Sequence, residues 1–279
     1  MPDATVCLTF DFDAISLWAA RGLTSPGYVS RGEFGAHAVP RILRLLRERD
    51  ISATFFIPGH TVETYPELCA AIAADGHEIG LHGYMHEPVS TLDAAKEAEA
   101  SQRAQEAIRR VTGFEVRGNR TPSWDYTPDT VQVLLDLGCE YDSSLMATDY
   151  RPYQVRQGDR FRQDGPYEFG EPTSIVEIPV SWTLDDYPQF EYLRTDIVLP
   201  GLRRPDDVFA NFLDDIDYMV REVPDGVCTL TFHPQVIGRG HRMLGLERFL
   251  DRCAQRPVRF QTCLDAARQF SGAVAASAR

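Results

Sequence analysis

The sequence predicts an α/β fold in which seven or eight strands form a closed or nearly closed β/α barrel. Apolar runs of strand length alternate with segments of helical period along the 279 residues, an alternation typical of a sheet covered by helices. No strand is followed by the G-x-G-x-x-G sequence of a dinucleotide-binding sheet. The polar clusters follow the carboxyl ends of the expected strands, which is where β/α barrels carry their chemistry.

The first half of the chain has strands and helices with clear boundaries. Residues 6–13 form an apolar run, a loop rich in Gly and Pro follows, and apolar residues then recur at helical spacing. Pro66 opens a later helix, and Asp75-Gly76 ends it. The expected elements, in order, are a strand at 6–13, a helix at 38–47, a strand at 53–57, a helix at 65–74, a strand at 78–81 and a helix at 93–113.

The second half repeats this alternation around one long connection. Residues 147–173 are rich in Arg, Gln, Asp, Gly and Pro and show no period, so we expect an irregular, substrate-facing insertion. The other expected elements are strands at 116–119, 139–142, 175–180, 227–233 and 258–260, and helices at 127–137, 205–222, 246–254 and 263–270. Because no linker or repeat interrupts the pattern, residues 1–279 are expected to form a single catalytic domain.

The composition limits the partners and the cellular compartment that we expect for this protein. With 28 Lys and Arg against 41 Asp and Glu, the formal charge is −13, which argues against nucleic acid or an anionic membrane as partner. No run approaches the roughly 18 apolar residues of a membrane span, and the first residues lack a basic segment followed by an apolar one. We therefore expect a cytoplasmic protein whose six cysteines, none of them in a C-x-x-C pair, are reduced core residues.

Two histidines with metal-ligand spacing follow the strand at 78–81. His82 and His86 are four residues apart, so both imidazoles can meet one divalent ion on a helical turn or on a tight turn leaving the strand. Alone, such a pair is more often two surface histidines than a metal site. The strand at 6–13, however, ends in Asp11 and Asp13 and so offers the carboxylate that a hard or borderline ion accepts.

Four motifs in the same order along the chain resemble those of the polysaccharide deacetylase family, also called carbohydrate esterase family 4. They are Thr9-Phe10-Asp11-Phe12-Asp13, His82-Gly83-Tyr84-Met85-His86, Arg120-Thr121-Pro122-Ser123-Trp124 and Thr231-Phe232-His233-Pro234. The resemblance implies a distorted β/α barrel that binds one divalent ion, commonly zinc. It assigns Asp11 as the general base, Arg120 as the residue that orients this base, and His233 as the general acid. The ligands that it implies are Asp13, His82 and His86.

Two departures from the sugar-deacetylating pattern bear on the substrate. Phe12 separates the two aspartates where the family has T-F-D-D-G, and residues 181–188 replace its D-x-x-D-W motif. The altered motifs resemble a branch that contains peptidoglycan deacetylases, cyclic imide hydrolases and metal-independent allantoinases. Asp185 or Asp186 is expected to orient His233 or to touch the substrate. Trp124 and Trp182 are either substrate platforms or ordinary core and rim aromatics.

The sequence thus predicts a metal-dependent hydrolase of non-peptide C–N bonds. The absence of an export signal favours a small cyclic imide or ureide as substrate over a cell-wall glycan. Three alternatives stay open: an N-deacetylase of N-acetylglucosamine-containing glycan or peptidoglycan, a metal-independent allantoinase, and a non-catalytic carbohydrate-binding barrel. The resemblance also implies a homo-oligomer, by family expectation a tetramer.

Overall fold

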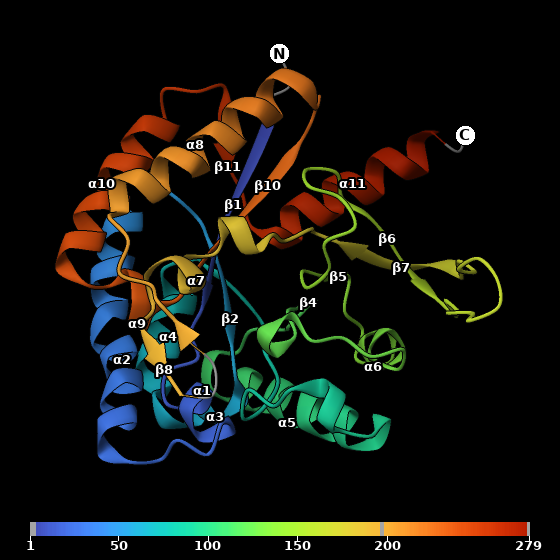
Figure 1. Cartoon of the computed structure of the whole chain (residues 1–279), viewed down its shortest axis with the longest axis horizontal. Helices are drawn as coiled ribbons and strands as arrows, with labels where there is room; N and C mark the ends of the chain where they lie inside the picture. Colours follow the sequence, from blue (N-terminus) through green and yellow to red (C-terminus); the bar gives the residue numbers. More distant parts are fainter. Residues whose placement is uncertain (1–3, 196–197, 278–279) are drawn as a thin grey trace.

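A curled sheet of nine strands forms the centre of the computed structural model, which describes residues 4–195 and 198–277 (Figure 1). The strands run in the order β10-β1-β2-β3-β4-β5-β7-β6, and β11 pairs with β1. Their bounds are Ala4–Asp11 (β1), Thr54–Ile57 (β2), Glu78–Leu81 (β3), Gly118–Asn119 (β4), Tyr141–Asp142 (β5), Tyr153–Gln157 (β6), Glu171–Glu177 (β7), Val227–Phe232 (β10) and Val258–Phe260 (β11). All pairs are parallel except β6 with β7. The predicted α/β barrel class is confirmed.

The barrel is not closed by a continuous strand. Between β7 and β10 the described chain makes one isolated parallel bridge, which joins Asp185 to Thr231. The segment that makes this bridge lies between a short 3₁₀ turn at Trp182–Leu184 and the helix α7 (Asp186–Phe190). This bridge takes the place of a full strand and explains why the barrel is distorted.

Helices cover the outside of the sheet. Figure 1 shows α2, α8 and α10 together on one side, α5 on another, and the β6–β7 hairpin projecting from the barrel. The helix bounds are Ser16–Ala20 (α1), Pro26–Arg47 (α2), Gly59–Thr64 (α3), Pro66–Ala74 (α4), Ala94–Thr112 (α5), Thr130–Asp136 (α6), Asp186–Phe190 (α7), Pro205–Glu222 (α8), Pro234–Ile237 (α9), Gly240–Cys253 (α10) and Cys263–Ser277 (α11), and a small hairpin pairs Leu193–Arg194 (β8) with Val198–Leu199 (β9). Within the described ranges, no helix is long and apolar enough to span a membrane.

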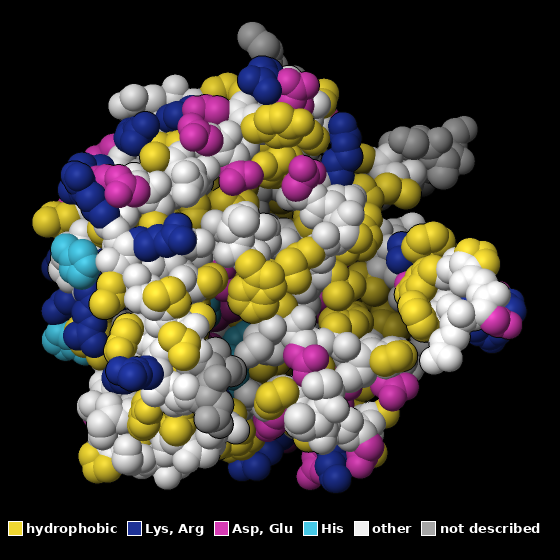
Figure 2. Space-filling view, in the orientation of Figure 1, with side chains coloured by type: hydrophobic (Ala, Val, Ile, Leu, Met, Phe, Trp, Pro, Cys, Tyr) yellow, Lys and Arg dark blue, Asp and Glu magenta, His cyan; other side chains and the backbone are white. Residues whose placement is uncertain are grey.

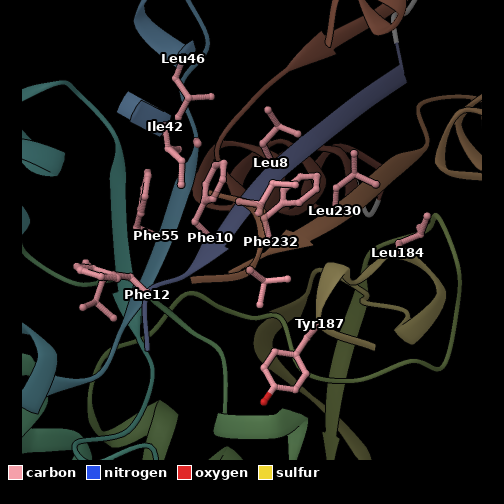
Figure 3. Close-up of a cluster of buried hydrophobic side chains, with 14 of the residues drawn as sticks. Leu8, Phe10, Phe12, Ile42, Leu46, Phe55, Leu184, Tyr187, Leu230 and Phe232 are labelled. Carbon is pink, nitrogen blue, oxygen red and sulfur yellow. The ribbon is translucent and has the colours of Figure 1, made fainter. Parts of the chain in front are cut away.

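Aromatic side chains hold α2 against the strands that position the site. Phe10 of β1 stacks on Phe55 of β2 with ring centroids 4.9 Å apart, and it also lies beside Phe232 of β10 at 5.6 Å. Figure 3 shows these rings below Ile42 and Leu46 of α2. All eight residues of β1 are buried. β1, which ends at Asp11 and leads to Asp13, is therefore packed on both of its faces.

Two segments that the sequence predicts to be loops contain helix or strand in the structure. The helix expected at 38–47 begins already at Pro26, and Gly32 lies inside it, where a Cβ would come within 2.6 Å of the Ala14 carbonyl oxygen. The glycine is thus a close-packing residue that allows α2 to approach the loop after β1. The connection expected to be irregular over 147–173 contains β6 and the start of β7, and its turn residues belong to an antiparallel hairpin. All six cysteines are buried and unpaired, as predicted.

Candidate active site

The expected site residues converge at the carboxyl edge of the sheet. Asp11 ends β1 and Asp13 follows two residues later, while His82, Arg120 and His233 each directly follow a strand, β3, β4 and β10 respectively. All five are buried. Parallel neighbours end at the same edge, so Asp11 and His233, 222 positions apart in the sequence, meet there. In Figure 2 a hollow near the middle of this face exposes carboxylate and histidine atoms beside a large apolar side chain.

Asp13, His82 and His86 have the spacing of ligands to one ion. Asp13 Oδ1 lies 3.3 Å from Nε2 of His82 and 3.7 Å from Nε2 of His86, and the three ligand atoms fall within 4.8 Å of one another. Ligands bound at ~2.1 Å around a tetrahedral ion lie roughly 3.4 Å apart. Asp13 Oδ1 is buried and accepts no hydrogen bond. A divalent cation would satisfy this oxygen, so the residues fit the metal that the family motif implies.

The two histidines have different electrostatic surroundings. Burial lowers the pKa of His82, but the carboxylates of Asp11 and Asp13 outweigh this effect and raise it. Nδ1 of His82 lies 2.7 Å from the carbonyl oxygen of Arg120 and can donate its hydrogen there, which leaves the Nε2 lone pair for a metal. Burial lowers the pKa of His86 to about 4, so that imidazole is neutral at pH 7. The pair stands on a tight turn leaving β3, in which Gly83 and His86 both have positive φ, 65° and 62°. For His86 this conformation is rare and is typical of a functional constraint.

Arg120 holds Asp11 in a fixed orientation. Its guanidinium donates from Nη1 to Asp11 Oδ1 at 2.8 Å and to the Thr9 hydroxyl at 2.7 Å. Nε and Nη2 donate to the carbonyl and hydroxyl of Ser143, both at 2.9 Å. The charge is fully buried and lies 4.3 Å from the centre of the Phe56 ring. Asp11 Oδ2 is left free and lies 4.0 Å from Nε2 of His233.

Asp186, and not Asp185, makes the hydrogen bond to His233. Asp186 Oδ1 lies 2.8 Å from Nδ1 of His233 and also accepts from its backbone N–H at 3.1 Å. Asp185 Oδ1 lies 3.6 Å from Nδ1 and instead accepts the backbone N–H of Tyr187 at 2.7 Å. Burial lowers the pKa of His233, but the two carboxylates outweigh this effect and raise the pKa well above its usual value. Burial raises the pKa of Asp185 to about 7.

A compact cavity of about 60 Å³ opens above these groups. Both expected tryptophans line it, with ring centroids 4.0 Å apart; Trp124 is 7% exposed and Trp182 is 45% exposed. Asp185 also lines the cavity, whereas Asp186 lies behind His233. The tryptophans are thus placed where a substrate would contact them, and the two aspartates face different neighbours.

The structure adds four residues that the sequence analysis missed. Leu17 and Arg21 reach the cavity from α1 and the residue after it, and Tyr187 reaches it from α7. Gln235 donates from Nε2 to Asp13 Oδ2 at 3.2 Å. Their only sequence signal was proximity to the motifs: Leu17 and Arg21 follow Asp13 within eight positions, and Gln235 follows His233 by two.

A buried Asp-His-His triad beside a carboxylate and an imidazole, at the open edge of a β/α barrel, defines the class of metal-dependent hydrolases. Residues 1–141 match the family model described as Polysaccharide deacetylase. A peptidoglycan deacetylase of Helicobacter pylori is 34% identical over 254 residues, which cover 86% of this chain and 87% of the relative. A peptidoglycan deacetylase-like protein of Gibberella zeae is 29% identical over 290 residues, 95% of this chain and 86% of the relative.

Solved structures agree with the sequence matches. A Mycobacterium smegmatis protein assigned to the polysaccharide deacetylases superposes with a TM-score of 0.84 at 32% identity, over 98% of this chain and 92% of that one. The allantoinase Puue shares the fold at 22% identity with a TM-score of 0.78, over 96% and 90% of the two chains. This chain therefore belongs to the polysaccharide deacetylase family, whose enzymes are metal-dependent hydrolases of C–N bonds. The family assignment therefore identifies this chain as an enzyme and not as the non-catalytic carbohydrate-binding barrel that the sequence left open.

Proposed function

We propose that this enzyme removes the acetyl group from N-acetylated amino sugars of the peptidoglycan type. The extended similarity to peptidoglycan deacetylases supports this substrate class over the cyclic imide or ureide expected from the sequence. We further propose zinc as the ion and Asp13, His82 and His86 as its ligands. The unsatisfied, buried Oδ1 of Asp13 between two Nε2 atoms is the observation that carries the proposal.

In this mechanism the residues of the chain hold and move two protons. A divalent ion at the triad would lower the pKa of a water and polarise the carbonyl group of the scissile amide. Asp11 accepts a proton from the attacking water through its free Oδ2, since Arg120 holds the other oxygen. His233 donates a proton from Nε2 to the leaving nitrogen, because Nδ1 is turned toward Asp186. Acetate and the free amine are the products.

Metal analysis joined to an acetate assay tests this proposal. The purified enzyme should contain one equivalent of zinc and release acetate from peptidoglycan fragments or chitin oligomers, and chelation should abolish both signals. His82→Ala and His86→Ala should lose metal and activity together. His37→Ala is the matched control, because His37 is exposed on α2 and contacts Arg41 rather than the site. Hydrolysis of allantoin that persists after chelation would instead support a metal-independent allantoinase.

A small cyclic imide or ureide is the second candidate substrate. The observation in its favour is the size of the cavity, about 60 Å³ under two closely packed tryptophan rings, whereas ligand pockets commonly enclose ~300 Å³ or more. A compact ring suits such a space better than a glycan chain does. Succinimide, hydantoin, dihydrouracil and allantoin should therefore be assayed beside the glycans at equal metal occupancy. Ring opening without acetate release would reverse our preference.

A further inference from the structure

Arg21 lies at the edge of the active-site cavity. It is the residue that follows α1, and α1 begins three positions after Asp13, so the site and this arginine belong to one short segment. The side chain lines the cavity and is exposed. Among the described residues that line this cavity, Arg21 is the one lysine or arginine. The cavity thus has a single fixed positive charge beside its carboxylates and aromatic rings.

The guanidinium of Arg21 has no carboxylate partner among residues 4–195 and 198–277. Its one hydrogen bond goes from Nη1 to the Tyr187 hydroxyl at 3.3 Å, and its Cζ lies 5.8 Å from the centre of that ring. Arg31, the next arginine in the sequence, is by contrast paired with Glu191. Within the described part of the chain, most of the five N–H donors of Arg21 are therefore left for another partner.

Tyr187 contacts both Arg21 and His233. The Tyr187 ring lies 5.1 Å from the ring of His233. A group bound by Arg21 would therefore lie next to a substrate amide held between His233 and the triad. The neutral acetamide itself needs no cation at this position. The planar fork of a guanidinium matches a carboxylate in a two-point contact.

We propose that Arg21 binds a carboxylate carried by the substrate, so that the preferred substrates are acylamino compounds with an acidic substituent near the scissile amide. This inference rests on the proposed function, because it concerns the same reacting centre. The carboxylate can be the lactyl ether group of an N-acetylmuramic acid unit or an acetic acid side chain on a cyclic ureide. Both present the same chemistry to Arg21, and the two sources are separated by experiment.

Two matched substrate pairs test the inference. N-acetylmuramic acid is compared with N-acetylglucosamine, and hydantoin-5-acetic acid with hydantoin, using the zinc-loaded full-length enzyme. We expect kcat/KM to be higher for the acidic member of the pair that reacts. In Arg21→Met the ratio of acidic to neutral substrate should fall about 10- to 100-fold, as is usual when a charge-assisted hydrogen bond is removed. Arg21→Lys should restore part of the ratio.

The controls keep this inference apart from the proposed function. Arg41→Met is the matched variant, because Arg41 is on α2 outside the cavity and contacts Gly238 and His37, and its ratio should equal that of the wild type. If the enzyme releases acetate from none of the amino sugars, peptidoglycan fragments or chitin oligomers, the proposed function is wrong. Calorimetric binding of the same four compounds to wild type and Arg21→Met then still measures the acidic-to-neutral ratio. An unchanged ratio in Arg21→Met, in turnover or in binding, overturns the role of Arg21.

Discussion

Replacing Asp186 by Asn should move the alkaline limb of the pH–rate profile to lower pH. Asp186 makes the short contact to Nδ1 of His233, 2.8 Å, and Asn at this position keeps an acceptor of the same shape while removing the negative charge. Burial lowers the pKa of His233, and the neighbouring carboxylates raise it because they stabilise the imidazolium. Without the charge of Asp186 the imidazole loses its proton at lower pH, and the enzyme loses its acid form earlier as pH rises.

The size of this effect follows from the contact distance. An opposite charge within about 4–6 Å changes a pKa by roughly 1–3 units, and each unit corresponds to about 1.4 kcal/mol. We therefore expect the limb to move by about 1–3 pH units and kcat at neutral pH to fall on the order of 10²-fold. Asp185→Asn should move the limb by less, because Asp185 Oδ1 lies 3.6 Å from Nδ1 and its hydrogen bond goes to the backbone of Tyr187.

The assay is kcat against pH for wild type and both variants at full metal occupancy, with metal content measured on the same samples. Metal content should stay at the wild-type level, because neither aspartate belongs to the triad of Asp13, His82 and His86. The reasoning is refuted if Asp186→Asn leaves the limb in place, or if Asp185→Asn moves it further than Asp186→Asn does.

Three other predictions concern the buried carboxylates and their partners. Asp11→Asn should retain the metal but lower turnover on the order of 10²-fold, as measured by metal analysis and acetate release. Arg120→Lys should keep the charge but lose the bonds to Ser143, and so lower the free energy of unfolding in urea by about 3 kcal/mol; a change well below 1 kcal/mol would contradict it. Burial and the charge of Asp142 raise the pKa of Glu177 well above its usual value, so folding becomes less favourable as pH rises from the unfolded toward the folded pKa. Glu177→Gln should therefore lose less thermal stability than wild type between about pH 5 and 7, and equal slopes would refute the explanation.

The barrel and the meeting of the motifs could be predicted because both follow from strand ends. Strands that pair in parallel end at one edge, so carboxylates after β1, histidines after β3 and His233 after β10 had to approach one another. The ordered motifs likewise identified the family. The roles of the individual site residues, a cytoplasmic location and a tetramer stay predictions.

The remaining features depend on contacts between segments distant in sequence. The choice between Asp185 and Asp186 requires the position of a non-strand segment against β10, which no periodicity encodes. The sequence predicts a loop at Gly32, because a glycine in a sequence does not reveal the backbone that approaches it, here that of Ala14. Arg21 carried no signal beyond its proximity to Asp13, because an exposed arginine is ordinary until its neighbours are known.

The incomplete closure of the barrel explains how His233 obtains its partner. The isolated bridge between Asp185 and Thr231 fixes the backbone of the closing segment against β10. His233 is two positions beyond Thr231, and Asp186 is one beyond Asp185, so the carboxylate of Asp186 lies where it accepts both the backbone N–H and Nδ1 of His233. A full strand at this place would pair its backbone with that N–H and would alternate its side chains across the sheet. Asp186, one of the residues that replace the family's fourth motif, thus orients His233 where the barrel lacks a strand.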